Sequence, residues 1–143
     1  MKIGELARAA RCTVETVRYY EREGLLPRAQ RTPSNYRSYG EPHLDRLRFI
    51  RNCRSLDMSH DEIRALLTLR QQPEASCAGV SRILEAHITH VVDRISELSR
   101  LRDELQELRD RCQDERDIDS CGIIQSLEAA TAEPPSGKPG HLC

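Results

Sequence analysis

The 143-residue chain has no Trp and only one Phe, and all of its aromatic residues precede position 50. Whatever packs beyond that point is therefore built from Leu, Ile, Val and Ala, a composition that suits helices packed along their length. A compact enzyme core with a deep cleft would need most of a chain this short. The composition favours a small domain with a helical extension over such an enzyme.

Long apolar runs are also missing. No stretch approaches the roughly 20 apolar residues that a membrane helix needs, and the opening Met-Lys-Ile-Gly-Glu lacks the apolar stretch of a secretion signal. We therefore expect a cytoplasmic protein with no membrane partner. In that reducing compartment, the six cysteines are better explained as thiols for metal or redox chemistry than as disulfides.

Charged residues are plentiful but unevenly placed. Residues 1–58 carry 12 Lys and Arg against 7 Asp and Glu, whereas residues 59–143 carry 10 against 16. Only the first part attracts a polyanion, although such a split also arises from chance surface composition.

Local signals predict four short helices and a hairpin in residues 1–72. Thr13 is suited to be the N-cap of the second helix. Turn-forming residues at 33–35 predict a short β-hairpin, or wing. Ser59 and Glu62 have the spacing of a capping box and mark the start of the fourth helix.

The most regular apolar pattern follows residue 80. It steps by three or four residues, with one stammer, through Leu84, Ile88, Val91, Ile95, Leu98, Leu101, Leu105, Leu108 and Cys112. The flanks are charged, so this helix has one narrow apolar stripe. An intramolecular packing helix is the alternative, but the chain after residue 72 has too little apolar surface to cover the stripe. A partner chain is therefore the better explanation, and the predicted fold class is all-α with a small β wing.

Two helices joined by a tight break near Cys12 fit a helix-turn-helix unit. Short polar and basic side chains on its second helix suit a major groove, and basic and aromatic residues alternate on the wing, where they can hold phosphates and pack on sugars. A Thr-capped helix and a solvated hairpin also occur in proteins that bind no DNA. The candidate DNA contacts are Thr13, Thr16, Arg18, Tyr19, Tyr20, Arg31, Tyr36, Arg37 and Arg54, with Tyr39 alongside them on the wing.

Several ordered motifs in this half resemble the DNA-binding domain of the MerR family. They are Ile3-Gly4-Glu5-Leu6-Ala7, Glu15-Thr16-Val17-Arg18-Tyr19-Tyr20-Glu21, Gly24-Leu25-Leu26, Asn35-Tyr36-Arg37-Ser38-Tyr39 and Leu47-Arg48-Phe49-Ile50. The likeness extends over residues 1–128. It implies a winged helix-turn-helix domain followed by a long antiparallel coiled-coil dimerisation helix. We divide the chain into a DNA-binding domain (1–72), a linker (73–78), a dimerisation helix (79–112), a metal-binding loop with a short helix (113–130) and a flexible tail (131–143).

Three cysteines bracket the long helix. A helix from residue 79 to 111 would be on the order of 50 Å long, so Cys77 and Cys112 of one chain cannot share an ion. In an antiparallel pair, Cys77 of one subunit meets Cys112 and Cys121 of the other, and two equivalent sites follow. The alternative for Cys112 is a buried apolar role in the seam.

Three thiolates without a fourth ligand suit Cd(II), Pb(II) or Hg(II), whereas Zn(II) prefers a completed tetrahedron. The loop between Cys112 and Cys121 has no His, but its carboxylates leave zinc open. The segments 52–58, 84–88 and 121–125 resemble the cadmium- and lead-responsive branch, which ranks Cd(II) or Pb(II) first, Hg(II) second and Zn(II) third.

A second, weaker metal site is possible at His87, His90, His141 and Cys143, although surface histidines are the simpler explanation. Cys12 and Cys53 are expected to be packing residues.

The resemblance implies a homodimer on promoter DNA that represses without metal and, with RNA polymerase holoenzyme, activates heavy-metal resistance genes once metal untwists the duplex. Two rivals remain. A thiol enzyme would need a base near its cysteine, and only Cys143 has a His nearby in sequence. A regulator of the same family that senses an organic ligand would carry a larger domain after the long helix.

Overall fold

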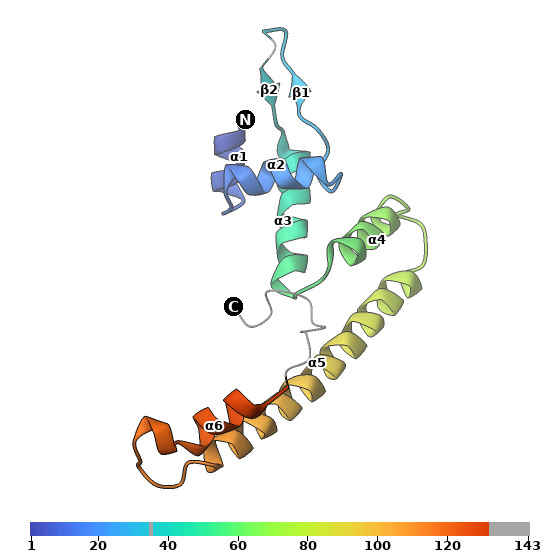
Figure 1. Cartoon of the computed structure of the whole chain (residues 1–143). Coiled ribbons are helices and arrows are strands. Elements are labelled where there is room, and N and C mark those ends of the chain that lie inside the picture. The colour runs from blue at the N-terminus through green and yellow to red at the C-terminus, as the bar shows by residue number, and fades with distance from the viewer. Residues whose placement is uncertain (35, 132–143) are drawn as a thin grey trace. The chain divides into compact units, whose positions relative to one another are not determined.

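The computed structural model describes residues 1–34 and 36–131, and the chain divides into two compact units, Met1–Thr89 and His90–Cys143. Figure 1 labels the elements. In order they are α1 (Ile3–Ala9), α2 (Val14–Arg22), β1 (Gln30–Arg31), β2 (Arg37–Ser38), α3 (Glu41–Ser55), α4 (His60–Arg70), α5 (Ala78–Asp110), the 3₁₀ turn η1 (Ile118–Ser120) and α6 (Gly122–Ala129).

The core of the first unit lies among α1 to α4. Its most deeply buried side chains are Leu6, Val17, Leu25, Leu26, Leu47, Ile50, Met58 and Ile63. Leu25, Leu26 and Met58 come from the loops, and each of the four helices buries at least two side chains on one face against the others. The partly buried Ile83 brings the first turns of α5 against this core. This packing fixes the helix-turn-helix, the wing and the start of α5 as one body.

Three turns of the first unit share one hydrogen-bond pattern. Helices α1, α2 and α3 each end in a Schellman motif, in which the residue after the C-cap adopts positive φ. These residues are Arg11 (φ 56°), Gly24 (φ 73°) and Asp57 (φ 60°). In the first motif Cys12 N–H donates to the Ala7 carbonyl over 2.9 Å. Only one of the three positions is occupied by glycine, the residue that tolerates positive φ without steric cost.

The wing is a two-stranded antiparallel hairpin, as the turn residues predict. Gln30 pairs with Ser38 and Arg31 with Arg37. Just beyond the strands, Thr32 N–H donates to the Tyr36 carbonyl over 2.7 Å. The wing follows α2 directly in sequence, and its second strand leads into α3, so both ends of the hairpin are anchored to core helices (Figure 1).

Helix α4 begins at the capping box that the sequence predicts. Ser59 Oγ accepts from Glu62 N–H over 3.1 Å, and Glu62 Oε1 accepts from Ser59 N–H over 2.9 Å. After α4 ends, the chain returns on itself, and the Gly79 backbone packs against the Leu69 side chain. A side chain at Gly79 would crowd Leu69, so this glycine allows the close approach of α5 to α4.

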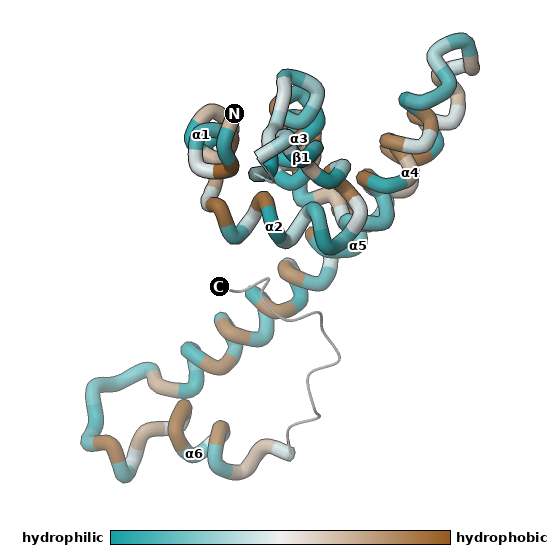
Figure 2. Tube along the Cα trace, turned by 90° about the horizontal axis from the view of Figure 1, so that it is seen from above, coloured by the Kyte–Doolittle hydropathy of each residue, from teal (hydrophilic) through white to brown (hydrophobic). Residues whose placement is uncertain are grey.

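The second unit contains most of α5, then a loop, η1 and α6. No residue of the 33-residue α5 is buried within this single chain. Apolar positions recur along it (Figure 2), and they include Leu84, Ile88, Val91, Ile95, Leu98, Leu101 and Leu105. Among the described residues, no helix is both long and apolar enough to cross a membrane.

Candidate nucleic-acid interface and metal centre

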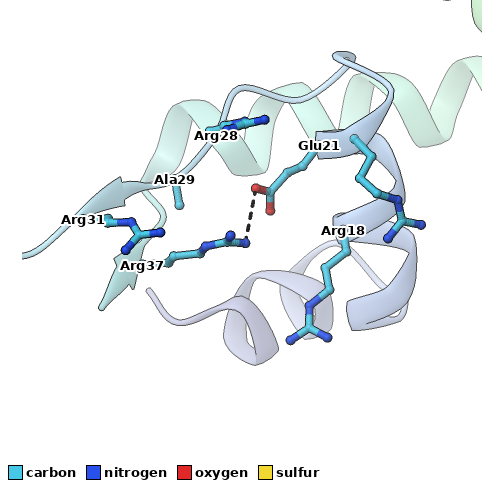
Figure 3. Close-up of a pocket in the computed structure, with 7 residues that line it drawn as sticks. Arg18, Glu21, Arg28, Ala29, Arg31 and Arg37 are labelled. Carbon is cyan, nitrogen blue, oxygen red and sulfur yellow. Dashed lines mark ion pairs between the residues drawn. The ribbon is translucent and has the colours of Figure 1, made fainter. Parts of the chain in front are cut away.

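Five arginines surround a pocket of about 620 Å³ between α2 and the wing. Figure 3 shows these side chains together with Glu21, the acidic residue of the lining, which is joined to Arg37 by an ion pair. The lining residues are Arg18, Glu21, Arg22, Arg28, Ala29, Arg31 and Arg37. Guanidinium groups on an exposed helix and hairpin are suited to hold phosphate groups.

Glu21 connects α2 to the wing. The Tyr39 hydroxyl donates to Glu21 Oε1 over 2.5 Å, and Arg37 Nη1 lies 4.0 Å from Glu21 Oε2. Burial first, and then the hydrogen bond to Glu21, raises the pKa of Tyr39 to about 12. The Tyr39 phenol is therefore protonated at neutral pH and donates a hydrogen bond to the Glu21 carboxylate.

Most of the predicted DNA contacts lie on the surface of the first unit. Thr13 caps α2, because its Oγ1 accepts from Thr16 N–H over 3.1 Å. Tyr36 is 71% exposed at the tip of the wing. Arg18, Arg31 and Arg37 line the pocket, and Arg54 is exposed and donates to the Met58 carbonyl at the end of α3.

Two tyrosines lie deeper than the sequence suggests. Tyr20 is 7% exposed and Tyr39 only 2% exposed, so both rings belong to the core. The hydrophobic stripe of α2 is wide enough to include Tyr20 beside Val17, and Tyr39 turns inward at the base of the wing to reach Glu21. Tyr19 remains partly exposed, with its hydroxyl 3.3 Å from His60 Nδ1.

Cys112 and Cys121 meet at the end of α5. The neighbouring Cys121 thiol is the main cause that raises the pKa of Cys112, and Cys112 Sγ donates to the Asp114 carbonyl over 3.5 Å. The pKa of Cys121 is lowered, chiefly by the backbone N–H of Ile124 and also by that of Ile123. Cys121 is the N-cap of α6, where unpaired backbone N–H groups favour a thiolate. The two sulfur atoms are soft ligands for a metal ion, and the pKa of Cys121 is the one shifted towards the thiolate form.

The loop between the two cysteines is closed by polar contacts. Arg111 Nη1 donates to Ser126 Oγ over 2.8 Å, and Ser126 Oγ donates to the Gly122 carbonyl over 2.7 Å. At the far side of the loop, Asp117 caps η1 by accepting from Ser120 N–H over 3.1 Å. These contacts hold the start of α6 against the end of α5, although no pattern in the sequence indicated η1.

Among the described residues, the three further cysteines lie in the first unit. Cys77 is exposed and precedes α5 by one residue. Cys53 is 8% exposed within the core, and Cys12 packs against the core. Burial raises the pKa of both Cys12 and Cys53, which is consistent with packing residues rather than reactive thiols.

His87 makes contacts that the sequence did not reveal. Its Nδ1 lies 3.0 Å from Glu62 Oε2, and its Nε2 lies 2.8 Å from the Leu56 carbonyl. Glu62, which caps α4, is thus a potential metal ligand that the spacing of His and Cys residues could not identify. His90 follows one turn later on α5 and is exposed. His141 and Cys143, the other members of the predicted second site, lie outside the described residues.

Comparisons with known proteins agree on one family. Residues 1–69 match the family described as MerR HTH family regulatory protein, and residues 44–108 match the family described as MerR, DNA binding. The chain is similar to the transcription regulator PbrR691 from Ralstonia metallidurans CH34, solved in complex with lead(II). The two share 51% identity and a TM-score of 0.80 over 89% of this chain and 98% of that one.

Two regulators known from sequence extend this comparison. A ZntR homolog from Haemophilus influenzae is 51% identical over 105 residues, which cover 73% of this chain and 78% of that protein. The mercuric resistance operon regulatory protein of Bacillus cereus is 37% identical over 126 residues, which cover 88% and 96% of the two chains. These relatives are regulators of transcription, not enzymes.

Proposed function

Because the chain belongs to the MerR family of helix-turn-helix regulatory proteins, we propose that it represses a promoter without metal and activates it when Pb(II) or Cd(II) binds to three cysteines. Membership of this family supports the function of a metal-responsive regulator of transcription for this chain. The natural targets are genes for efflux or sequestration of the same ion.

The proximity of Cys112 and Cys121 is the observation that supports the metal site. Two thiols nine positions apart in sequence come together, and the N-terminus of α6 favours the charged form of one of them. A metal ion needs deprotonated sulfur, so these groups are suited to binding. Cys77, exposed before α5, is the proposed third ligand.

The proposed ion is soft and large. Lead(II) is the ion in the complex of the 51% identical regulator, which supports Pb(II) for this chain, and Cd(II) fits the same three sulfur ligands. The mercuric regulator of Bacillus cereus keeps Hg(II) as an alternative. Zn(II) is the weakest candidate, since three sulfur atoms leave its tetrahedron incomplete.

We further propose a homodimer in which the α5 helices pair in opposite directions. The helix has 33 residues and therefore spans about 50 Å, with Cys77 before its start and Cys112 just beyond its end. Its apolar stripe is exposed along its length, which is unusual for a helix without a partner. An antiparallel pair covers the stripe and brings Cys77 of one subunit to Cys112 and Cys121 of the other.

The arginine pocket and the exposed tip of the wing support DNA binding through phosphate contacts. We propose that the exposed residues among the predicted DNA contacts bind promoter DNA. The buried Tyr20 supports the neighbouring Tyr19, since their ring centroids lie 5.7 Å apart. RNA polymerase holoenzyme is the proposed partner at the promoter. Metal binding would then act by changing the conformation of the bound duplex.

A second metal site is proposed at His87 and His90. The position of Glu62 Oε2 beside His87 supports it, because a carboxylate and an imidazole form a common ligand pair. The tail residues His141 and Cys143 would complete this site in the proposed arrangement.

A metal titration of the reduced protein tests the main site. Pb(II) and Cd(II) are expected to produce thiolate charge-transfer absorption, which each of Cys77→Ser, Cys112→Ser and Cys121→Ser should abolish or strongly weaken. Cys53→Ser is the matched control, since the Cys53 thiol lies in the core, and it should leave the titration unchanged. Full affinity in any of the three variants removes that cysteine from the site.

Mixed dimers test whether the site is shared. A Cys77→Ser chain and a Cys112→Ser/Cys121→Ser chain bind no metal at this site as separate homodimers. Co-expressed with different tags and purified as a mixed dimer, they restore one intact site if Cys77 comes from the partner. A mixed dimer that binds no metal contradicts the antiparallel arrangement.

A further inference from the structure

One carboxylate lies within the arginine pocket. Glu21 lines the pocket together with five arginines and forms an ion pair with Arg37 (Figure 3), and its side chain is 9% exposed. A negative charge beside a phosphate-binding surface weakens the attraction for DNA. Its position in this pocket therefore calls for a compensating role.

The contacts of Glu21 come from two different elements. Glu21 lies in the last turns of α2, whereas Arg37 and Tyr39 belong to β2 and the residue that follows it. The two carboxylate oxygens are divided between these partners, with Oε1 accepting from the Tyr39 hydroxyl and Oε2 facing Arg37. The strands pair over only two residues each, and this contact joins the end of the hairpin to the helix.

We propose that Glu21 is a positioning residue for DNA binding: it holds the wing against α2 and aims Arg37 at a DNA phosphate. The proposal rests on the proposed function, since it concerns how the same DNA-binding surface is assembled. Arg37 remains 56% exposed while paired at 4.0 Å, so Glu21 orients the guanidinium without removing it from the surface. The Tyr39 ring is buried in the core, so its hydroxyl has a fixed position. The hydrogen bond from this hydroxyl therefore holds the Glu21 carboxylate in place.

The direction in which Glu21→Gln changes DNA affinity distinguishes a positioning role from simple charge repulsion. Glu21→Gln removes a negative charge, so a mere repulsive charge predicts tighter DNA binding. The positioning role predicts weaker binding, by up to about 5-fold, because the ion pair that orients Arg37 is lost. Glu15→Gln is the matched control, since Glu15 is an exposed glutamate of the same helix. It removes the same charge and should leave binding unchanged or slightly tighter.

The probe is a duplex selected from a random pool by the wild-type dimer, with a random-sequence duplex beside it. Affinity is measured over a range of salt concentrations. For Glu21→Gln, the slope of log affinity against log salt should fall by about 0.9 for each phosphate that the protein no longer neutralises. A change confined to fold stability would lower the folded fraction, which circular dichroism measures, without changing this slope.

A double-mutant cycle with Arg37→Gln completes the test. Arg37→Gln should weaken binding strongly in the wild-type background and much less in the Glu21→Gln background, because both act through one contact. Tyr39→Phe keeps the carboxylate but removes its hydrogen bond, and should weaken binding in the same direction. If Glu21→Gln is unfolded at the assay temperature, the cycle of Tyr39→Phe with Arg37→Gln decides, and additive effects there overturn the proposal.

The two proposals fail in different ways. If the wild-type protein binds no duplex with salt-dependent affinity, the proposed function fails. If it binds DNA but Glu21→Gln binds as tightly as Glu15→Gln, only the positioning role of Glu21 is overturned.

Discussion

Gly122 packs its backbone against the carbonyl oxygen of Arg111, and a Cβ at this position would overlap that oxygen. Each of the two residues is the sequence neighbour of a candidate metal ligand, Cys121 and Cys112. The close approach of their backbones therefore brings the two thiols close to each other. The side chain of Arg111 strengthens the same contact through Ser126.

We expect Gly122→Ala to weaken metal binding, because the carbonyl of Arg111 is backbone and cannot rotate away from a new methyl group. The start of α6 must shift, and the two sulfur atoms separate. Removal of such support typically reduces metal affinity by about 10- to 100-fold. Competition with a chelator measures this affinity for Pb(II) or Cd(II).

Gly4→Ala is the control for that substitution. Gly4 lies in α1, and a Cβ there meets no atom within 4 Å among the described residues. The change should leave metal affinity unaltered and stabilise the fold by about 0.4–1 kcal/mol, because alanine loses less entropy on folding. Equal metal affinity in Gly122→Ala and wild type would show that the two cysteines tolerate separation.

The thiols of Cys121 and Cys112 should differ in reactivity towards iodoacetamide. The backbone N–H of Ile124 lowers the pKa of Cys121, whereas the hydrogen bond to Cys121 raises the pKa of Cys112. Thiolate is the reactive form, so alkylation of Cys121 should persist to lower pH than that of Cys112. Peptide mass spectrometry of samples quenched at a series of pH values gives both rates.

The same shifts set the pH dependence of metal binding and of stability. Below the raised pKa of Cys112, metal binding must displace its proton, so affinity should rise with pH through that range. The lowered pKa of Cys121 contributes stability that is present above the ordinary thiol pKa and lost as pH falls through the folded value. In Cys112→Ala, the pKa of Cys121 should rise, because the contact with the Cys112 thiol that lowers it is lost. An unchanged alkylation profile would show that the two thiols do not interact.

Local signals in the sequence predicted much of this fold. The capping box of Ser59 and Glu62 and the turn residues of the wing are formed by near neighbours in the chain, so their chemistry is visible without the structure. The DNA-binding fold, the long helix and the meeting of Cys112 with Cys121 were also accessible, the last because only nine positions separate the two.

Contacts between distant segments were not predictable from spacing. Glu62 and His87 are 25 positions apart. From the sequence alone, Glu62 is explained by its role in the capping box and His87 by a place on the surface, so nothing indicates that they meet. The Glu21 and Tyr39 pair depends on a tyrosine turning inward at the base of the wing, where alternation with arginine suggested an exposed position. Such pairs arise from the packing of whole elements, which the local pattern does not encode.

Backbone strain can be tested at two of the three Schellman turns. Gly24 has φ 73° and Arg11 has φ 56°, so the first suits glycine and the second places a side chain in the left-handed region. Gly24→Ala should destabilise the fold by about 1–2 kcal/mol, and Arg11→Gly should stabilise it by up to about 1 kcal/mol after the entropy of glycine is included. Denaturant unfolding of both variants measures the difference, and opposite signs are the expected result.

Tyr39 should be the last tyrosine to ionise. Burial and the bond to Glu21 raise its pKa to about 12, against about 10 for an unperturbed tyrosine. The stability that this phenol contributes is therefore complete below pH about 10 and lost as pH rises through about 12. Absorbance titration of phenolate should show a high-pH step that Tyr39→Phe removes.

Tyr36→Phe is the matched control, because Tyr36 is 71% exposed on the same hairpin. It should leave the high-pH step and the stability almost unchanged. Tyr39→Phe should destabilise the fold at neutral pH by about 1–3 kcal/mol, since the buried Glu21 carboxylate loses a hydrogen bond. That difference should shrink between pH 10 and 12, because wild type loses the contribution of the phenol there while the phenylalanine variant has none to lose. A constant difference across this range would mean that the Tyr39 hydroxyl is not held by Glu21 in solution.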